Sequence, residues 1–163
     1  MRGLRRKEKE IKNRKELVAI LEGAAYITIA MCSDNQPYLV TLNHGYDKDG
    51  NCIYFHCAQE GKKIDILRVN DRIWGQALVD KGYVQGKCDH LYATTHFAGR
   101  VTFVTEYEEK KHALILMIKA LEEEPERVIR SQLTKESIFN VGIGRIDIET
   151  MSGKKAEKAI VSM

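Results

Sequence analysis

The stretch IYFHCAQEGKKIDILRVN, residues 53–70, joins a strand pattern to a helix pattern through a short polar turn. An apolar, β-like run ends in His56-Cys57, and Gly61-Lys62-Lys63 opens the helical pattern. Two lysines there lie at the positive end of the helix dipole, where cations are disfavoured. An anion held by the helix amides and both ammonium groups would explain them, although two solvated lysines on a surface turn would also fit. The stretch therefore predicts a strand-to-helix turn with the features of a phosphate clamp.

The composition is that of a globular protein. The chain has 163 residues, 44% of them hydrophobic and 30% charged, with a net charge of +3. This length predicts a single domain over residues 1–163. No apolar run is long enough to cross a bilayer, and the charged N-terminus lacks the apolar core of a secretory signal. We therefore expect a cytoplasmic protein that makes no membrane contact.

The first fifteen residues include eight Arg or Lys side chains. We expect a basic N-terminal helix over about residues 4–22, with Leu17, Ile20 and Leu21 as its apolar stripe and Gly23 as its stop. Such a charge run is usually a solvated face. A nucleic-acid contact is the alternative, but it is disfavoured because no aromatic residue is interleaved with the charges.

The four cysteines are Cys32, Cys52, Cys57 and Cys88, and no two of them form a CxxC pair. A cytoplasmic setting argues against disulfides, and small core residues are the simplest interpretation. Pairing Cys57 with His56, or Cys88 with His90, does not give the spacing of a zinc site, so we expect no metal.

The rest of the chain reads as short strands with helices inserted between some of them. The expected strands are 25–32, 37–46, 51–57, 73–79, 92–104 and 137–148, and the second and third form a hairpin. The expected helices are 61–69, one that begins after Thr105 as N-cap with Glu108 completing a capping box, and a short one from Pro125. We expect a loop over 82–89 and a loosely ordered C-terminal tail over about 151–163. This pattern predicts a mostly β protein, a six-stranded antiparallel barrel with peripheral helices.

Polar groups concentrate around the hairpin. Thr41 and Asn43 share one face of the second expected strand, its partner strand ends at His56, and the lysine pair follows directly. A flat cofactor with a phosphate tail needs cations and amides for the phosphate, donors and acceptors for a polar ring rim, and an apolar wall. Flavin mononucleotide (FMN) fits these requirements. Taken alone, His56 and His96 lie on expected strands among apolar residues, which favours hydrogen-bonded structural roles for them.

These motifs resemble a known superfamily. PYLVTLNHGYD (37–47), the stretch 53–70, YATTHFAGRVTFVTE (92–106) and SGK (152–154) are similar to the FMN-binding split-barrel superfamily, which includes the pyridoxamine 5′-phosphate oxidases. Within it, the nitroimidazole-resistance (Nim-like) group is the most similar. The resemblance covers about residues 5–155 and implies a six-stranded antiparallel split β-barrel of the FMN-binding type.

The resemblance implies a homodimer with two FMN molecules at the subunit interface. By position, Lys62 and Lys63 correspond to the basic pair that holds the FMN phosphate. The segment Val40, Thr41, Leu42 and Asn43 corresponds to the strand that runs along the flavin, largely through backbone hydrogen bonds. His56 and Cys57 match the strand end beside the cofactor, and Thr94 a position that reaches it from the other subunit. His56 is thereby the candidate catalytic residue, as a donor to substrate or in proton transfer.

Two departures from the oxidases argue against oxidation of pyridoxamine phosphate. Those enzymes carry a C-terminal tryptophan and arginine in the substrate pocket, and the tail IETMSGKKAEKAIVSM (148–163) has neither. The sole tryptophan is Trp74. The basic residue on the second strand that contacts the phosphate in those oxidases also has no clear counterpart in LVTLNH (39–44).

Three functions follow as hypotheses. The first is an FMN-dependent reductase of small electron-poor molecules, of nitroaromatic or quinone type, with a nicotinamide or other electron donor. The second keeps the barrel but binds haem, with His56 or His96 as axial ligand, or a deazaflavin. The third is a non-enzymatic module that stores flavin or binds nucleic acid through the basic N-terminal segment.

Overall fold

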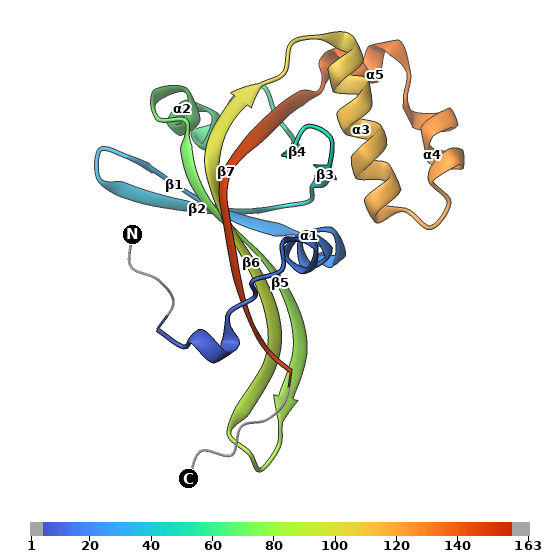
Figure 1. Ribbon diagram of the computed structural model, residues 1–163. Helices are drawn as coiled ribbons and strands as arrows, with labels where there is room; N and C mark the ends of the chain where they lie inside the picture. Colours follow the sequence, from blue (N-terminus) through green and yellow to red (C-terminus); the bar gives the residue numbers. More distant parts are fainter. Residues whose placement is uncertain (1–4, 158–163) are drawn as a thin grey trace.

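A seven-stranded antiparallel sheet forms the centre of the molecule in the computed structural model, which describes residues 5–157 (Figure 1). The strand order is β2-β1-β5-β6-β7-β4-β3. The strands are β1 (Ile27–Ser33), β2 (Gln36–Leu42), β3 (Gly45–Asp47), β4 (Cys52–Cys57), β5 (Arg72–Val84), β6 (Asp89–Phe103) and β7 (Gly142–Ala156). The predicted mostly β, split-barrel fold is confirmed.

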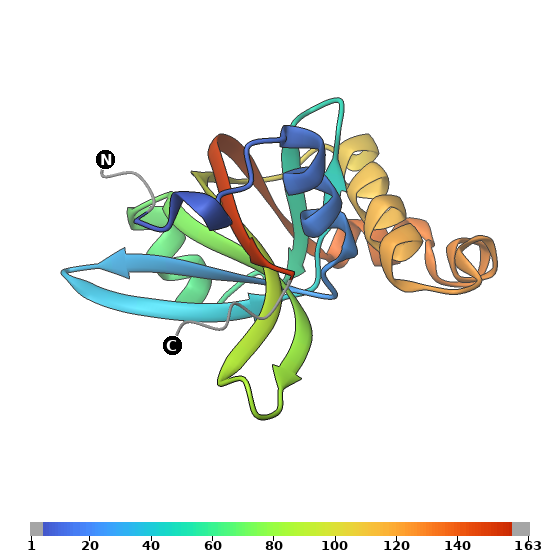
Figure 2. The ribbon, with the colours of Figure 1, turned by 60° about the horizontal axis from the view of Figure 1, so that its bottom comes forward.

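The helices lie around the sheet. They are the short 3-10 helix η1 (Lys7–Lys9) and the α-helices α1 (Arg14–Gly23), α2 (Lys62–Val69), α3 (Tyr107–Leu121), α4 (Pro125–Gln132) and α5 (Lys135–Asn140). Figures 1 and 2 show α3, α4 and α5 grouped on one side of the sheet, with α2 well apart from them. α1 packs on β5 and β6, and α3 packs on β3 and β4. Within residues 5–157, no helix is long and apolar enough to span a membrane.

The core lies on the inner face of the curved sheet. Its fully buried members include Ile27, Ile29, Ile53, Phe55 and Phe97. Strand alternation explains the set, because every second residue of β1 is buried while its neighbours are partly exposed. Burial of large apolar side chains is the main stabilising contribution to such a fold.

The expected second strand, 37–46, is divided into β2 and β3 by Asn43 and His44, so the sheet has seven strands and not six. The His44 ring is buried, and its Nε2 is 2.8 Å from the carbonyl oxygen of Leu21 in α1. Gly45 then lies so close to α3 that an added Cβ would be 2.9 Å from the Met117 amide nitrogen. Contacts with two helices therefore bend the chain at this point.

The N-terminal helix begins later than expected. α1 starts at Arg14, where the Asn13 side chain accepts a hydrogen bond from the Lys15 amide at 2.9 Å. Before it, Glu10 forms an isolated bridge with Lys154, and the Ile11 amide donates to Gly153. These bonds to β7 hold the segment extended, so a continuous helix over 4–22 was wrong. The start of the expected helix, residue 4, lies outside the described residues.

The segment expected as a loop, 82–89, is the end of a hairpin. β5 continues to Val84 and β6 starts at Asp89, leaving only residues 85–88 as the turn. The N-cap of α3 is Glu106 and none of the described side chains caps it, so the capping box predicted from Thr105 was wrong.

The expected last strand, 137–148, is divided between two elements. α5 occupies its beginning, and Thr134 and Ser137 form the capping box of that helix. β7 then runs to Ala156, pairing with β6 as far as Tyr92. Residues 151–156, expected in a loosely ordered tail, are thus part of a strand. The end of that tail, 158–163, lies outside the described residues.

Candidate functional site

The site begins at the N-terminus of α2. Gly61 is its N-cap, with φ 127° and ψ 168°, a conformation that residues with a Cβ rarely adopt. No side chain of residues 5–157 caps this end, and the first intrahelical bond from this turn runs from the Asp65 amide to the Gly61 oxygen at 3.0 Å. The amides of the first turn are therefore free to bind a ligand, and the helix dipole favours an anion there.

The two predicted lysines lie over aromatic rings on different strands. Lys62 Nζ is 4.5 Å from the centroid of the Tyr38 ring on β2, and Lys63 Nζ is 5.3 Å from that of Phe55 on β4. Neither lysine forms an ion pair with any of the residues 5–157. One ammonium group thus lies at β2 and the other at β4, and neither has an acidic partner among residues 5–157, which suits a phosphate.

The strands beside the lysines have open edges. Throughout the described part of the chain, β2 pairs only with β1. β3 pairs with β4 only over Cys52–Tyr54, so Phe55–Cys57 pair with β7 alone. Unpaired backbone groups of such edges can form hydrogen bonds with the rim of a planar ligand.

The side chains of the predicted β2 segment divide between two faces. Val40 and Leu42 pack against the core. Thr41 and Asn43 point the other way, as expected. The Thr41 hydroxyl lies 3.0 Å from that of Thr28, and the Asn43 amide donates to the Ala25 carbonyl oxygen. Because these polar groups already have partners within the chain, the backbone of β2 is the part left for a ligand.

His56 and Cys57 lie on opposite faces of β4. His56 is exposed, whereas Cys57 is half-buried and packs against the core. Burial raises the pKa of the Cys57 thiol above its ordinary value, although the charges of Lys63 and Lys110 act in the opposite direction. The structure therefore separates the two side chains, and burial favours the neutral form of the Cys57 thiol.

Thr94 lies in the middle of β6, apart from the lysine pair. It is buried, and its hydroxyl donates to the carbonyl oxygen of Lys154 on β7 at 3.2 Å. Within one chain it belongs to the sheet, and its predicted role in the site of a second subunit stays a prediction.

Sequence reasoning missed the aromatic partners of the lysines. Tyr38 and Phe55 lie in the quoted motifs, but their positions beside α2 depend on how the strands curve. Gly144 makes the Phe55 position possible, because a Cβ at Gly144 would lie 2.2 Å from the Phe55 ring. The available sequence signal for the position of Phe55 was a glycine on a strand that could pair with the strand of this aromatic residue.

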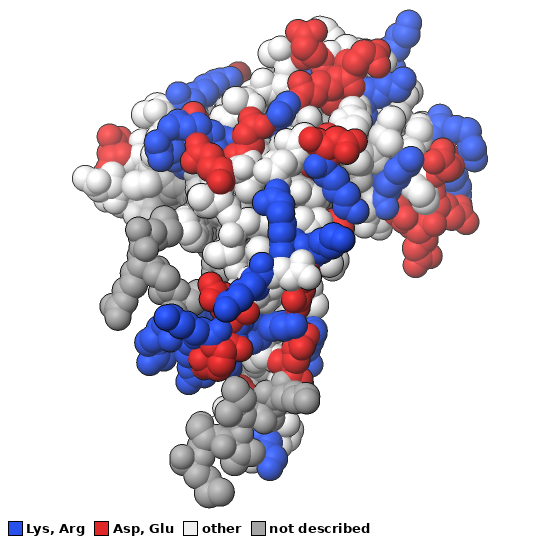
Figure 3. Space-filling model, viewed as in Figure 1, with Lys and Arg blue, Asp and Glu red and all other residues white. Residues whose placement is uncertain are grey.

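One face of the sheet exposes large apolar side chains. Leu39 and Trp74 are both opposite Ala30 in the strand register, so they share a face, and they are 62% and 40% exposed. Tyr26 and Leu78 are also exposed. A row of exposed apolar groups is characteristic of an interaction surface. On the face shown in Figure 3, charges of both signs are mixed, and acidic side chains lie among the Lys and Arg side chains over the N-terminal segment.

The family model described as pyridoxamine 5′-phosphate oxidase matches residues 13–155. No curated protein matches the chain.

Several solved structures share the fold. A candidate 5-nitroimidazole antibiotic resistance protein from Bacteroides thetaiotaomicron is 23% identical, with a TM-score of 0.78 over 90% of this chain and 86% of its own. The flavocytochrome Anf3 from Azotobacter vinelandii is 14% identical, with a TM-score of 0.83 over 99% of this chain and 75% of its own. An FAD- and haem-binding protein from Mycobacterium smegmatis is 14% identical, with a TM-score of 0.78 over 95% and 77%. At these identities the likeness shows the fold.

Proposed function

Because the chain belongs to the pyridoxamine 5′-phosphate oxidase family, we propose that it is a flavin-binding oxidoreductase with FMN as its cofactor. The observation that carries this proposal is the uncapped start of α2, where Lys62 and Lys63 have no acidic partner among the described residues. A phosphate monoester would accept hydrogen bonds from the free amides and from the two ammonium groups.

The neighbouring residues fit the rest of the cofactor. The open backbone edge of Val40, Thr41, Leu42 and Asn43 would meet polar atoms of the ring system, and the end of β4 at His56 and Cys57 would lie beside it. When bound, FMN supplies reversible transfer of one or two electrons. The protein orients the ring and holds its phosphate.

The proposed substrates are small electron-poor molecules of nitroaromatic or quinone type, with a nicotinamide or another donor as the source of electrons. His56 is the proposed catalytic residue because it is exposed at the strand end and can donate a hydrogen bond or a proton. The similar Bacteroides thetaiotaomicron protein is named for resistance to 5-nitroimidazoles, which are nitroaromatic compounds, and this name supports the proposed substrate class.

We also propose that the active form is a homodimer with the cofactor at the subunit interface. The exposed apolar face of Tyr26, Leu39, Trp74 and Leu78 supports a large subunit contact. In such a dimer Thr94 of one subunit would reach the cofactor of the other.

The absorption spectrum of the purified protein tests the cofactor assignment. We expect two broad flavin bands, and release of FMN after denaturation. A colourless protein that does not take up added FMN would refute the proposal.

Haem is the second candidate, because two proteins of the same fold are named as a flavocytochrome and as an FAD- and haem-binding protein. Possible axial ligands are His56 and the half-buried His96, whose pKa is lowered by burial and by the charge of Lys154. A single intense Soret band in the same spectrum would favour haem over flavin.

A further inference from the structure

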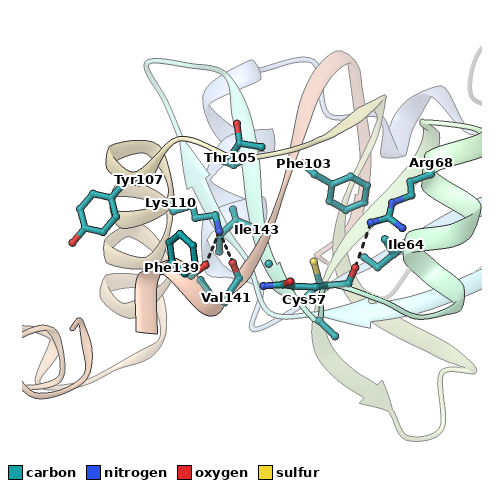
Figure 4. A pocket seen from close by; sticks show the side chains of 14 residues that line it. Cys57, Ile64, Arg68, Phe103, Thr105, Tyr107, Lys110, Phe139, Val141 and Ile143 are labelled. Carbon is teal, nitrogen blue, oxygen red and sulfur yellow. Dashed lines mark hydrogen bonds between the residues drawn. The ribbon is translucent and has the colours of Figure 1, made fainter. Parts of the chain in front are cut away.

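A cavity of about 470 Å³ lies between α2 and the α3–α5 group, apart from the lysine pair. Its size falls within the range of roughly 300–1,000 Å³ typical of small-molecule sites. In Figure 4, Ile64 and Arg68 of α2 enter from one side and Lys110 and Phe139 from the other. Phe103 and Ile143 supply further apolar wall, so most of the lining is hydrophobic.

The cavity has positive charge without compensating acid. Arg68 and Lys110 line it, and none of its lining residues is Asp or Glu. Among residues 5–157 the Arg68 guanidinium makes one long hydrogen bond, 3.5 Å, to the Gln59 carbonyl oxygen. Lys110 donates to the carbonyl oxygens of Phe139 and Val141 at 3.1 and 2.9 Å, which holds its ammonium at the end of α5. Arg68 therefore keeps most of its donors for a ligand.

We propose that this cavity binds a small amphipathic carboxylate, with the carboxylate on Arg68 and the apolar body against Phe103 and Ile143. An arginine fork matches the two oxygens of a carboxylate, and the hydrophobic walls match a ring or a short chain. The site is distinct from the phosphate clamp, because Lys62 and Lys63 do not line the cavity.

Cys57 connects the two sites. It follows His56 at the end of β4, and Figure 4 shows its sulfur directed into the cavity. A ligand in the cavity covers this thiol, so alkylation of Cys57 reports occupancy. Peptide mass spectrometry distinguishes it from exposed Cys88.

The probe is 2-naphthoate, with neutral 2-naphthamide for comparison, and the measurement is isothermal titration calorimetry. We expect naphthoate to bind the full-length protein at least about tenfold more tightly than the amide, because only the acid forms a charge-assisted pair. Arg68→Gln should remove this preference. Arg72→Gln is the matched control, since Arg72 is exposed, does not line the cavity and carries the same charge.

A second variant tests the location without altering charge. Ala58→Trp should fill the cavity from its exposed rim and abolish naphthoate binding, so that adding naphthoate no longer changes the alkylation of Cys57. The proposal would be overturned if naphthoate did not bind the wild type, or if the Arg68→Gln variant bound it as tightly as the wild type does. It would also be overturned if Ala58→Trp left naphthoate binding unchanged. Replacing Lys62 and Lys63 with alanine should leave naphthoate binding intact, so this result is independent of the flavin assignment.

Discussion

Lys62 and Tyr38 connect the start of α2 to β2: the ammonium nitrogen is 4.5 Å from the centroid of the phenol ring. The ring orients the ammonium without neutralising it, since a cation–π contact leaves the charge available to an anion. Lys63 has the same relationship with Phe55 on β4. The first two residues of α2 thus place their ammonium groups over rings of two different strands, at a helix end that no side chain of residues 5–157 caps.

Removing both charges should release the cofactor. We expect Lys62→Ala combined with Lys63→Ala to weaken FMN binding about 100-fold, or about 2.7 kcal/mol, because two charge-assisted bonds to the phosphate are lost. Quenching of FMN fluorescence on titration measures the affinity. The matched control is Lys12→Ala with Lys15→Ala, which changes the net charge equally at two exposed positions. Equal affinities for both double variants would contradict the clamp.

Gly61→Ala should damage the site through the backbone alone. An added Cβ would meet no atom of the described residues within 4 Å, but φ is 127°, so the cost is conformational strain of about 1–3 kcal/mol in the free energy of unfolding. Relaxation of that strain would turn the first amides of α2 and lower FMN affinity. Urea unfolding measures the stability.

Gly23→Ala is the control for Gly61→Ala. It also has open space around the Cβ position, but its φ is not in the left-handed region. We expect its stability to stay level or to rise by up to about 1 kcal/mol, because alanine favours the helix. If both variants lost the same stability, strain at Gly61 would not be the cause.

How much the sequence predicts differs along the chain. β4 and α2 were readable because a short apolar run and helical spacing are local signals, and the turn at Gly61 with its two lysines could be placed from them. The break at His44 was not readable, because it depends on a carbonyl oxygen 23 residues away in α1 and on the close approach of Gly45 to α3. α5 was read as strand because short apolar segments such as the one around Ile138 fit both periods.

The candidate site also has parts that the sequence could show and parts that it could not. Lys62 and Lys63 could be identified by type and spacing, but Tyr38 beneath Lys62 depends on the curvature of the sheet. Arg68 stands four residues after Ile64 on the same helix face, which sequence could show. The cavity that they line also needs Phe103 and Lys110 from distant elements. The sequence could not show that these residues come together.

Gly144 and Phe55 should behave as a coupled pair. Gly144→Ala would place a Cβ 2.2 Å from the Phe55 ring, and we expect a loss of about 1–3 kcal/mol from overpacking. Combining it with Phe55→Leu makes room, so the double variant should lose less stability than the sum of the two single variants. Denaturant unfolding of all four proteins completes the cycle. Strict additivity would show that the ring is not what excludes the Cβ.

Stability should fall between neutral and mildly acidic pH because of His44. Burial lowers the pKa of His44 below 6.5 in the folded protein, so the unfolded chain binds a proton first as the pH falls. The stabilising contribution is therefore present above pH 6.5 and is lost as pH falls toward the folded-state pKa. Melting temperatures measured from about pH 7.5 to about pH 5.0 should show this loss.

His44→Gln isolates the contribution of that group. Glutamine does not titrate and keeps a donor for the Leu21 carbonyl oxygen, so the fall in melting temperature over the same range should shrink. Part of it should remain, because burial also lowers the pKa of His96. An unchanged pH profile would assign the effect to other groups.

Trp74 should control subunit association. It is 40% exposed on the same sheet face as Leu39, and burying both in a subunit contact removes a large apolar area from water. Trp74→Glu would place a charge in that contact, so we expect sedimentation velocity to show a monomer where the wild type is a dimer. Tyr107→Glu is the control, because Tyr107 is 37% exposed but lies at the start of α3.

If the dimer is lost and the cofactor lies at the interface, FMN affinity falls in the Trp74 variant although every residue of the lysine clamp is intact. Retained affinity in a monomer would place the complete cofactor site within one chain.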